Sequence, residues 1–175
     1  MSEQNHPHSA GEKLLNAYDR MMERVQQALN ETDKGAFPRL RHAIEKAEEL
    51  TAELGELSEE EARKIGTYIQ RDIEDAANYL ASPEADELAS WLRFDVEQAE
   101  ERMLEAFMSV ADQTKIDLLK LETEAQLPTT YHTGEITGIG TLECTQCSKH
   151  YHFTQTGHIP PCSCNNTTFS RVNEN

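Results

Sequence analysis

The spacing of apolar residues changes near Pro128, and this change divides the chain into two parts. Before it, apolar positions recur every three or four residues, which is typical of one face of an amphipathic α-helix. After it, short runs rich in Thr, Ile, Tyr and Phe are separated by turn residues, which favours β-strands. We therefore predict a disordered tail over residues 1–8, a helical region over residues 9–126 and a small β module over residues 127–175.

Four helices are predicted from the apolar stripes and from residues that start or stop helices. The first begins at Ser9, and the second begins near Pro38, a favoured first-turn residue, and ends at Gly55. The third begins with the capping-box pair Ser58 and Glu61. The stripes are Leu14, Tyr18, Met21, Val25 and Ala28 in the first helix, Phe37, Leu40, Ile44, Ala47, Leu50 and Leu54 in the second, and Ala62, Ile65, Ile69, Ile73, Ala76 and Leu80 in the third.

The fourth stripe is the longest and runs from Leu88 to Leu121, after a new start at Ser82 and Pro83. An unbroken helix here would have roughly 40 residues and a length of about 60 Å. This length favours a mainly α fold in which an elongated antiparallel hairpin or coiled-coil bundle precedes the β module. Because its stripes and caps are self-contained, we expect the helical region to fold without the module.

Charge and composition narrow the class of protein. The net charge is −16 over 175 residues, and residues up to Leu127 carry −15 of it. An acidic surface repels phosphate backbones, which argues against nucleic-acid binding by the helical region. The first eight residues lack the basic and apolar segments of a secretory signal, and no apolar run approaches the roughly 20 residues that span a bilayer. We expect a cytoplasmic protein that does not bind membranes.

All four cysteines lie in the β module, as the pairs Cys144/Cys147 and Cys162/Cys164. Zn²⁺ prefers such ligands in a tetrahedron, and two turns that face each other can close a four-ligand site. A cytoplasmic location disfavours disulfides, and strand-like flanks disfavour a thioredoxin-like redox pair. We predict one structural zinc ion bound by these four cysteines. Because the module is too small to bury a sufficient core, it would depend on the metal for folding.

The β module also resembles a known family. The residues that carry the resemblance are the run 131–140, then Leu142, Cys144 and Cys147, then Pro161 and Cys162, and the closing Phe169, Ser170 and Arg171. In these motifs the chain resembles the YbeL-like family of bacterial zinc-ribbon-containing proteins. The acidic helical part agrees in length and placement, although the specific motifs lie only in the ribbon. The resemblance implies a C-terminal zinc ribbon with a metal site. It implies no activity, because the family has no established function.

One feature departs from this family, whose second cysteine pair usually has two intervening residues. Here only Ser163 separates Cys162 from Cys164. Residues two apart in an extended backbone share a side, but both sulfurs reach one ion only if the chain bends. Asn165 and Asn166 could supply left-handed turn geometry for that bend. If Cys164 does not reach the ion, one of three histidines could complete a Cys₃His site: His158, His150 or His152. We favour four cysteines, and zinc is not distinguished from iron.

Three function classes fit these observations to different degrees. A saturated Cys₄ site has no open coordination position, which favours a non-enzymatic adaptor or regulator with a protein partner, or a homo-oligomer through the helices. A nucleic-acid-binding ribbon usually has clustered basic residues, and this ribbon has only Lys149 and Arg171. A rubrerythrin-like redox protein needs Glu-x-x-His on two helices, but His42, the only histidine in the predicted helices, follows Arg39 at that spacing.

Overall fold

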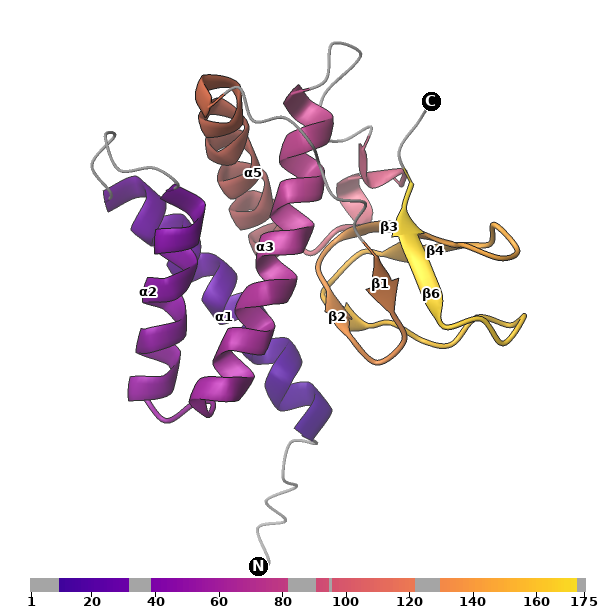
Figure 1. Cartoon of the computed structure of the whole chain (residues 1–175), viewed down its shortest axis with the longest axis horizontal. Coiled ribbons are helices and arrows are strands. Elements are labelled where there is room, and N and C mark those ends of the chain that lie inside the picture. The colour runs from indigo at the N-terminus through magenta and orange to yellow at the C-terminus, as the bar shows by residue number, and fades with distance from the viewer. Residues whose placement is uncertain (1–9, 32–38, 82–90, 95, 122–129, 173–175) are drawn as a thin grey trace, which may run out of the picture.

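The computed structural model describes residues 10–31, 39–81, 91–94, 96–121 and 130–172, with side chains undescribed at 96 and 116–121. Figure 1 shows a bundle of helices with a small β module packed against one side. The predicted mainly α fold followed by a C-terminal ribbon is confirmed. The helices are α1 (Ala10–Glu31), α2 (Arg39–Glu53), α3 (Glu59–Ala81), the 3₁₀-helix η1 (Val96–Gln98) and α5 (Glu101–Leu121).

The turn between α2 and α3 follows its sequence signals closely. Gly55 has φ 70°, a left-handed value that glycine adopts without strain, and it ends α2 as predicted. The Ser58 amide donates to Glu61 Oε2 at 3.0 Å, and the Glu61 amide donates to Ser58 Oγ at 3.1 Å. This reciprocal pair confirms the capping box at the start of α3. The predicted start at Pro38 lies outside the described residues.

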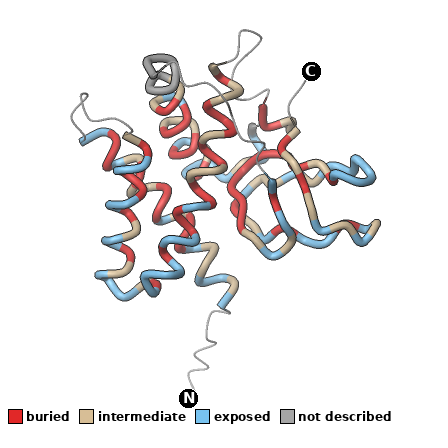
Figure 2. Tube along the Cα trace, viewed as in Figure 1, coloured by how far each residue is buried: buried red, intermediate tan, exposed pale blue. Residues whose placement is uncertain are grey.

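The apolar stripes of the helices meet in one core, which Figure 2 shows as the red inner faces of the bundle. The stripes predicted for α1 and α3 are buried, except that Leu14 is only partly buried. In α2 the predicted stripe fails at its end, because Leu50 is 41% exposed and Leu54 is 59% exposed. Thr51 takes the inward position instead, and its hydroxyl donates to the Ala47 carbonyl at 2.7 Å and accepts from Arg24 Nη1 at 2.7 Å. Phe37 lies outside the described residues.

The predicted long fourth helix is wrong, because the chain leaves helical geometry between Leu92 and Glu101. Arg93 has a left-handed φ of 65°. The β module accounts for the break. The Leu92 carbonyl accepts a hydrogen bond from the Thr141 hydroxyl at 2.7 Å, and the Glu100 amide donates to the Thr154 carbonyl at 2.9 Å. These partners lie far along the chain, so a local helical pattern does not reveal them. The predicted new start at Ser82 and Pro83 lies outside the described residues.

The β module contains two small antiparallel sheets. Its strands are β1 (Tyr131–His132), β2 (Ile136–Thr137), β3 (Gly140–Cys144), β4 (His150–Phe153), β5 (Gly157–His158) and β6 (Thr168–Arg171). One sheet has the order β1-β6-β3-β4, and β2 pairs with β5 in the other. The predicted strand-like runs 134–143, 151–156 and 167–172 contain β2 and β6, cover β3 and β4 except for Cys144 and His150, and miss β1 and β5. A small core of Tyr131, Leu142, Ile159 and Phe169 lies beside Cys144 and Cys162.

Among the described residues, no helix combines the length and the apolar character that crossing a bilayer needs.

Candidate metal centre

The structure brings all four cysteine sulfurs together. Cys144 ends β3 and Cys147 lies in the following turn, whereas Cys162 and Cys164 lie between β5 and β6. The four Sγ atoms all lie within 4.8 Å of one another, with 3.6 Å between Cys144 and Cys164 and 3.5 Å between Cys147 and Cys162. With zinc–sulfur bonds of about 2.3 Å, a tetrahedron has an edge of about 3.8 Å. The cluster therefore has the size of a four-thiolate metal site.

The turns around the two cysteine pairs explain how the shorter second pair reaches this cluster. Asn165 has a left-handed φ of 68°, and its amide donates to the Cys162 carbonyl at 2.9 Å. Ser148 occupies the equivalent place after Cys147. Its φ is 61°, and its backbone N–H donates a hydrogen bond to the Cys144 carbonyl at 3.0 Å. In both turns the residue after the second cysteine adopts the left-handed conformation. This geometry was predicted at Asn165 and missed at Ser148, although the position after the cysteine was the available signal.

Asn166 has a different role, because its side chain connects the two turns. Its Nδ2 atom donates to Cys144 Sγ at 3.3 Å, to Thr145 Oγ1 at 3.0 Å and to the Thr168 carbonyl at 2.8 Å. The Gln146 amide also approaches Cys144 Sγ at 3.5 Å. Donors of this kind stabilise a thiolate and orient it towards a metal ion.

The thiols affect one another's protonation. The backbone N–H of Cys164 and the Tyr151 hydroxyl lower the pKa of Cys162 to about 6. The Lys149 N–H lowers the pKa of Cys147, but Cys162, burial and the other two thiols together raise it to about 12. Four thiols this close together titrate as one coupled group, in which ionisation of one thiol raises the pKa of its neighbours. A divalent cation that binds all four sulfurs must displace the remaining protons.

The histidines proposed as alternative ligands make other contacts. His158 Nε2 lies 3.2 Å from the Gly11 carbonyl oxygen, and His152 Nδ1 lies 2.7 Å from Thr141 Oγ1. His150 Nε2 lies 3.8 Å from Glu143 Oε2. On α2, His42 Nδ1 lies 3.8 Å from Glu45 Oε2, and its side chain is 60% exposed. Within the described part of the chain, the group of possible ligands around the sulfurs contains cysteines alone.

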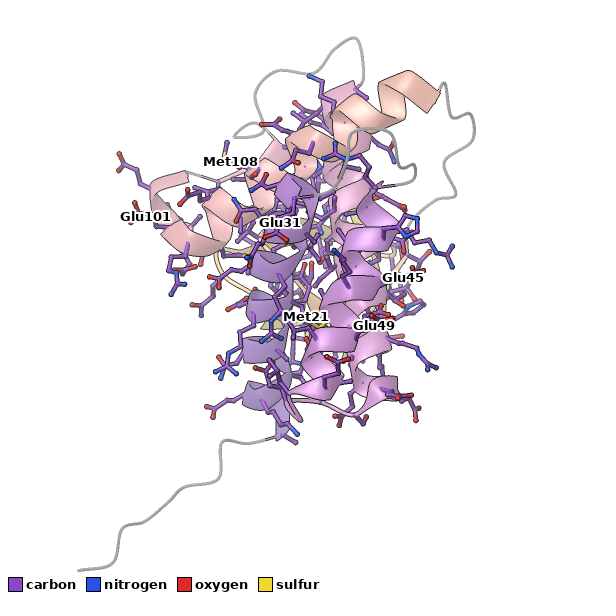
Figure 3. All side chains as sticks on the ribbon, turned by 90° about the vertical axis from the view of Figure 1, so that its left-hand side faces the viewer. Met21, Glu31, Glu45, Glu49, Glu101 and Met108 are labelled. Carbon is purple, nitrogen blue, oxygen red and sulfur yellow. The ribbon has the colours of Figure 1, made fainter. Side chains whose placement is uncertain are left out.

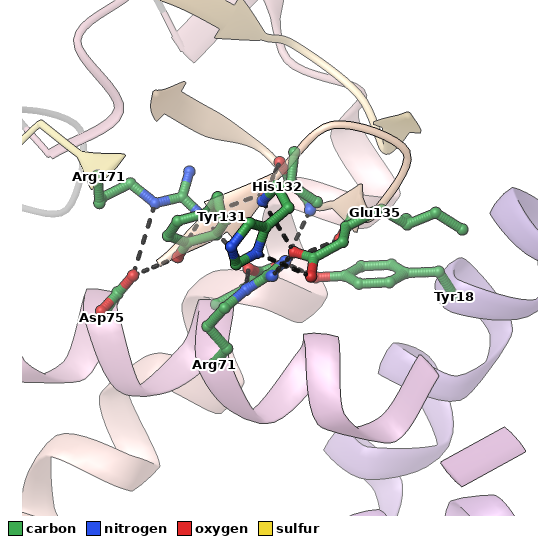
Figure 4. A network of polar contacts seen from close by, with 11 residues as sticks. Tyr18, Arg71, Asp75, Tyr131, His132, Glu135 and Arg171 are labelled. Carbon is green, nitrogen blue, oxygen red and sulfur yellow. Dashed lines mark hydrogen bonds and ion pairs between the residues drawn. The ribbon is translucent and has the colours of Figure 1, made fainter. Parts of the chain in front are cut away.

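A buried polar network joins the β module to α3, as Figure 4 shows. Arg171 Nη2 lies 3.4 Å from Asp72 Oδ1 and donates to Tyr131 Oη at 3.1 Å and to Thr137 Oγ1 at 3.2 Å. Asp72 Oδ2 accepts from the Tyr18 hydroxyl at 2.5 Å and from the Gly138 amide at 2.9 Å. The network therefore connects α1, α3, β1, β6 and the segment after β2.

Two further contacts complete the network. The Tyr131 hydroxyl donates to Asp75 of α3. Arg71 donates to Glu135 Oε2 at 2.5 Å and to the Ile136 carbonyl at 2.9 Å, and its guanidinium lies 4.0 Å from the centre of the Tyr131 ring. The sequence patterns did not predict this network. The available signal was the placement of Asp72 and Asp75 beside the apolar stripe of α3.

A small antiparallel module in which two cysteine-bearing turns bring four sulfurs together defines the zinc-ribbon class. The family model for a zinc-ribbon containing domain matches residues 27–173, and the chain belongs to that family. The resemblance to YbeL-like proteins is confirmed.

The curated relatives agree with this family. The chain is 25% identical over 139 residues to "Uncharacterized protein YbeL" of Escherichia coli strain K12. The aligned region covers 75% of this chain and 83% of that protein. Proteins of the same name from the O6:H1 and O157:H7 strains match with the same identity and coverage. No solved structure matches the chain significantly.

Proposed function

We propose that the chain is a non-enzymatic adaptor or regulator that acts in the cytoplasm through contacts with another protein. In this proposal one structural zinc ion stabilises the fold of the ribbon and is bound by Cys144, Cys147, Cys162 and Cys164. The ribbon in turn packs against an acidic helical bundle. The convergence of all four sulfurs within 4.8 Å is the observation that carries the proposal.

The closed ligand set supports a structural role for the metal. A catalytic zinc keeps one position for water or substrate, whereas four thiolates fill a tetrahedral ion. Iron would accept the same ligands, so elemental analysis of freshly purified protein has to identify the metal. We expect about one zinc per chain, because four thiolates make one site. Metal-free protein with four titratable thiols would contradict the metal assignment.

The helical surface supports a protein partner. Figure 3 shows Glu45 and Glu49 on α2 and Glu31 on α1 on one side of the bundle. The exposed Leu50 lies on α2 near Glu31 and Lys46, and the exposed Leu54 follows the end of α2. Exposed apolar side chains on a strongly acidic helical region suit a partner segment that carries both basic and apolar residues. A second copy of the chain is the alternative partner, and like charge opposes its binding at this face.

Affinity purification from the native host tests this proposal with three proteins: wild type, Cys144→Ser and the double variant Leu50→Ser/Leu54→Ser. We expect a defined protein partner with wild type that is reduced in both variants. A matched control, Glu101→Ser/Glu105→Ser, changes two exposed residues of α5 and should retain the partner. Salt-dependent binding of single-stranded or duplex nucleic acid, without a protein partner, would overturn the proposal in favour of a nucleic-acid-binding ribbon.

A further inference from the structure

One face of the β3–β4 hairpin carries four polar side chains that the cysteine cluster does not use. Glu143 of β3 is opposite His150 of β4, and Thr141 is opposite His152. Opposed residues of an antiparallel pair share a face, as do residues two apart along a strand. Thr141, Glu143, His150 and His152 therefore lie together on this face. His150 and His152 are exposed, and Glu143 is half-buried.

A chain of hydrogen bonds fixes the protonation of the His152 ring. The Thr141 hydroxyl donates its one proton to the Leu92 carbonyl oxygen at 2.7 Å. Thr141 Oγ1 therefore accepts at its second contact, which is His152 Nδ1 at 2.7 Å. A neutral His152 then carries its proton on Nδ1, and Nε2 keeps a free lone pair. Metal-binding histidines have this arrangement, in which the second ring nitrogen donates to an oxygen and sets the tautomer.

Two further side chains with possible ligand atoms, His150 and Glu143, lie on the same face as His152. The His150 and His152 rings lie edge to face with centres 6.4 Å apart, and His150 Nε2 lies 3.8 Å from Glu143 Oε2. Two ligands that bind one ion at about 2.1 Å are roughly 3.0–3.4 Å apart. His150 Nε2 and Glu143 Oε2 are slightly farther apart than this, and among the described residues only the cysteines converge as a ligand group in this conformation. Metal binding at this face therefore requires rotation of the exposed His150 and the half-buried Glu143 side chains. The His152 ring is held by Thr141 and by an edge contact with Phe94, whose ring centre is 6.2 Å away.

The two basic side chains of the ribbon are directed away from this face. Lys149, the nearest lysine in sequence, directs its Nζ elsewhere, 3.3 Å from Ser163 Oγ and 5.4 Å from the centre of the Tyr151 ring. The Arg171 guanidinium is buried in the network with Asp72. No positive side chain of the hairpin therefore competes with a metal ion here among the described residues.

We propose that His150, His152 and Glu143 form a second metal site on the ribbon, for a divalent transition-metal ion that prefers imidazole ligands. Such a site differs in chemistry from the cysteine cluster. Its two nitrogens and one carboxylate leave coordination positions open to water, so its ion exchanges with solution. The buried Thr141 acts as a positioning residue, because it orients His152 without touching the ion.

Nickel titration of the full-length, untagged chain tests this site after the zinc content has been measured. Thiolate-to-nickel charge-transfer absorption reports any Ni²⁺ at the cysteines, so binding without that absorption reports the histidines. The background variant His6→Gln/His8→Gln removes the two histidines of the N-terminal segment. We expect one Ni²⁺ per chain without charge-transfer absorption, measured by calorimetry or competition with a chromophoric chelator.

The variants assign the ligands and the positioning residue. His150→Gln and His152→Gln should each weaken nickel binding by at least about tenfold, and Glu143→Gln should weaken it less. Thr141→Val should also weaken nickel binding about tenfold, which is the lower end of the loss in metal affinity typical when a residue that orients a ligand is removed. His132→Gln and His158→Gln, which change two other exposed ribbon histidines, should leave the affinity unchanged. Binding that survives His152→Gln, or that falls equally in the His132→Gln control, would overturn the assignment, as would the absence of binding.

Discussion

Arg171 of β6 lies 3.4 Å from Asp72 of α3, and their side chains are only 2% and 0% exposed. The same strand leads directly to the cysteine cluster, because Phe169 is paired with Cys144 of β3. The strand pair that carries Cys144 therefore also carries the buried ion pair with α3. Ile136 and Ile139 of the ribbon also belong to that core, with Tyr18, Ile69 and Phe107. This arrangement couples the metal site to the bundle.

Replacing Arg171 with methionine should strongly destabilise the protein. The substitution keeps an apolar stem but removes the guanidinium that lies near both Asp72 and Asp75. Removal of one partner from a buried ion pair typically costs about 3–5 kcal/mol, and we expect the lower end because Arg71 Nε still lies 3.2 Å from Asp72 Oδ1. Chemical denaturation of the zinc-loaded protein measures the free energy of unfolding. The control is Arg63→Met, since Arg63 pairs with Glu59 at 3.5 Å with side chains 71% and 80% exposed. Equal losses in both variants would show that the buried network adds nothing specific.

Removing the metal should lower the stability of the helices as well as that of the ribbon. The sequence predicts a helical region that folds independently, but the shared core and the Asp72 contacts favour coupled unfolding. If the loss of ribbon contacts on chelation lowers the free energy of unfolding by about 3 kcal/mol, the melting temperature of the helical signal should fall by roughly 6–12 °C. Circular dichroism at 222 nm with and without chelator measures this change. An unchanged melting temperature would support the independent helical region.

The buried tyrosines should link stability to alkaline pH. Burial, followed by the charge of Asp72, raises the pKa of Tyr18 well above its usual value, and burial also raises the pKa of Tyr131. A raised pKa in the folded state means that stability is full below the unfolded value of about 10 and falls as pH rises above it. Absorbance at 295 nm should therefore show both tyrosines ionising together with the loss of helical signal. In Tyr18→Phe, that step should lose the amplitude of one tyrosine. A step of unchanged size would contradict the assignment.

The sequence was sufficient for features that depend on neighbouring residues. The capping box at Ser58 and Glu61, the stop at Gly55 and the stripe of α3 follow from local chemistry and periodicity. The cysteine pairs likewise predicted which four side chains converge. The break after Leu92 was not predictable in this way, because it depends on bonds to Thr141 and Thr154, which are remote in sequence. The Asp72 network was not predictable for the same reason, because a charged residue beside an apolar stripe does not indicate which remote residues it contacts.

The short second cysteine pair gives the sharpest test of the candidate site. Cys164 Sγ lies 3.6 Å from Cys144 Sγ, while His158 Nε2 lies 3.2 Å from the Gly11 carbonyl oxygen. If all four cysteines bind zinc, Cys164→Ser should weaken zinc binding about as strongly as Cys144→Ser, because each change removes one thiolate from a four-ligand set. His158→Ala should then have little effect.

Competition with a chromophoric chelator measures zinc affinity for these three variants and the wild type. Asn165→Gly provides a matched control for the turn, because glycine also adopts the left-handed φ of 68° found at that position. We expect this variant to bind zinc as the wild type does. A loss of zinc affinity in Cys164→Ser would then come from the missing thiolate and not from a change in the turn. Tight binding by Cys164→Ser together with weak binding by His158→Ala would replace the Cys₄ assignment with a Cys₃His site. The metal ligand would then be Nδ1 of His158, since Nε2 cannot bind a metal while that nitrogen donates to the Gly11 carbonyl.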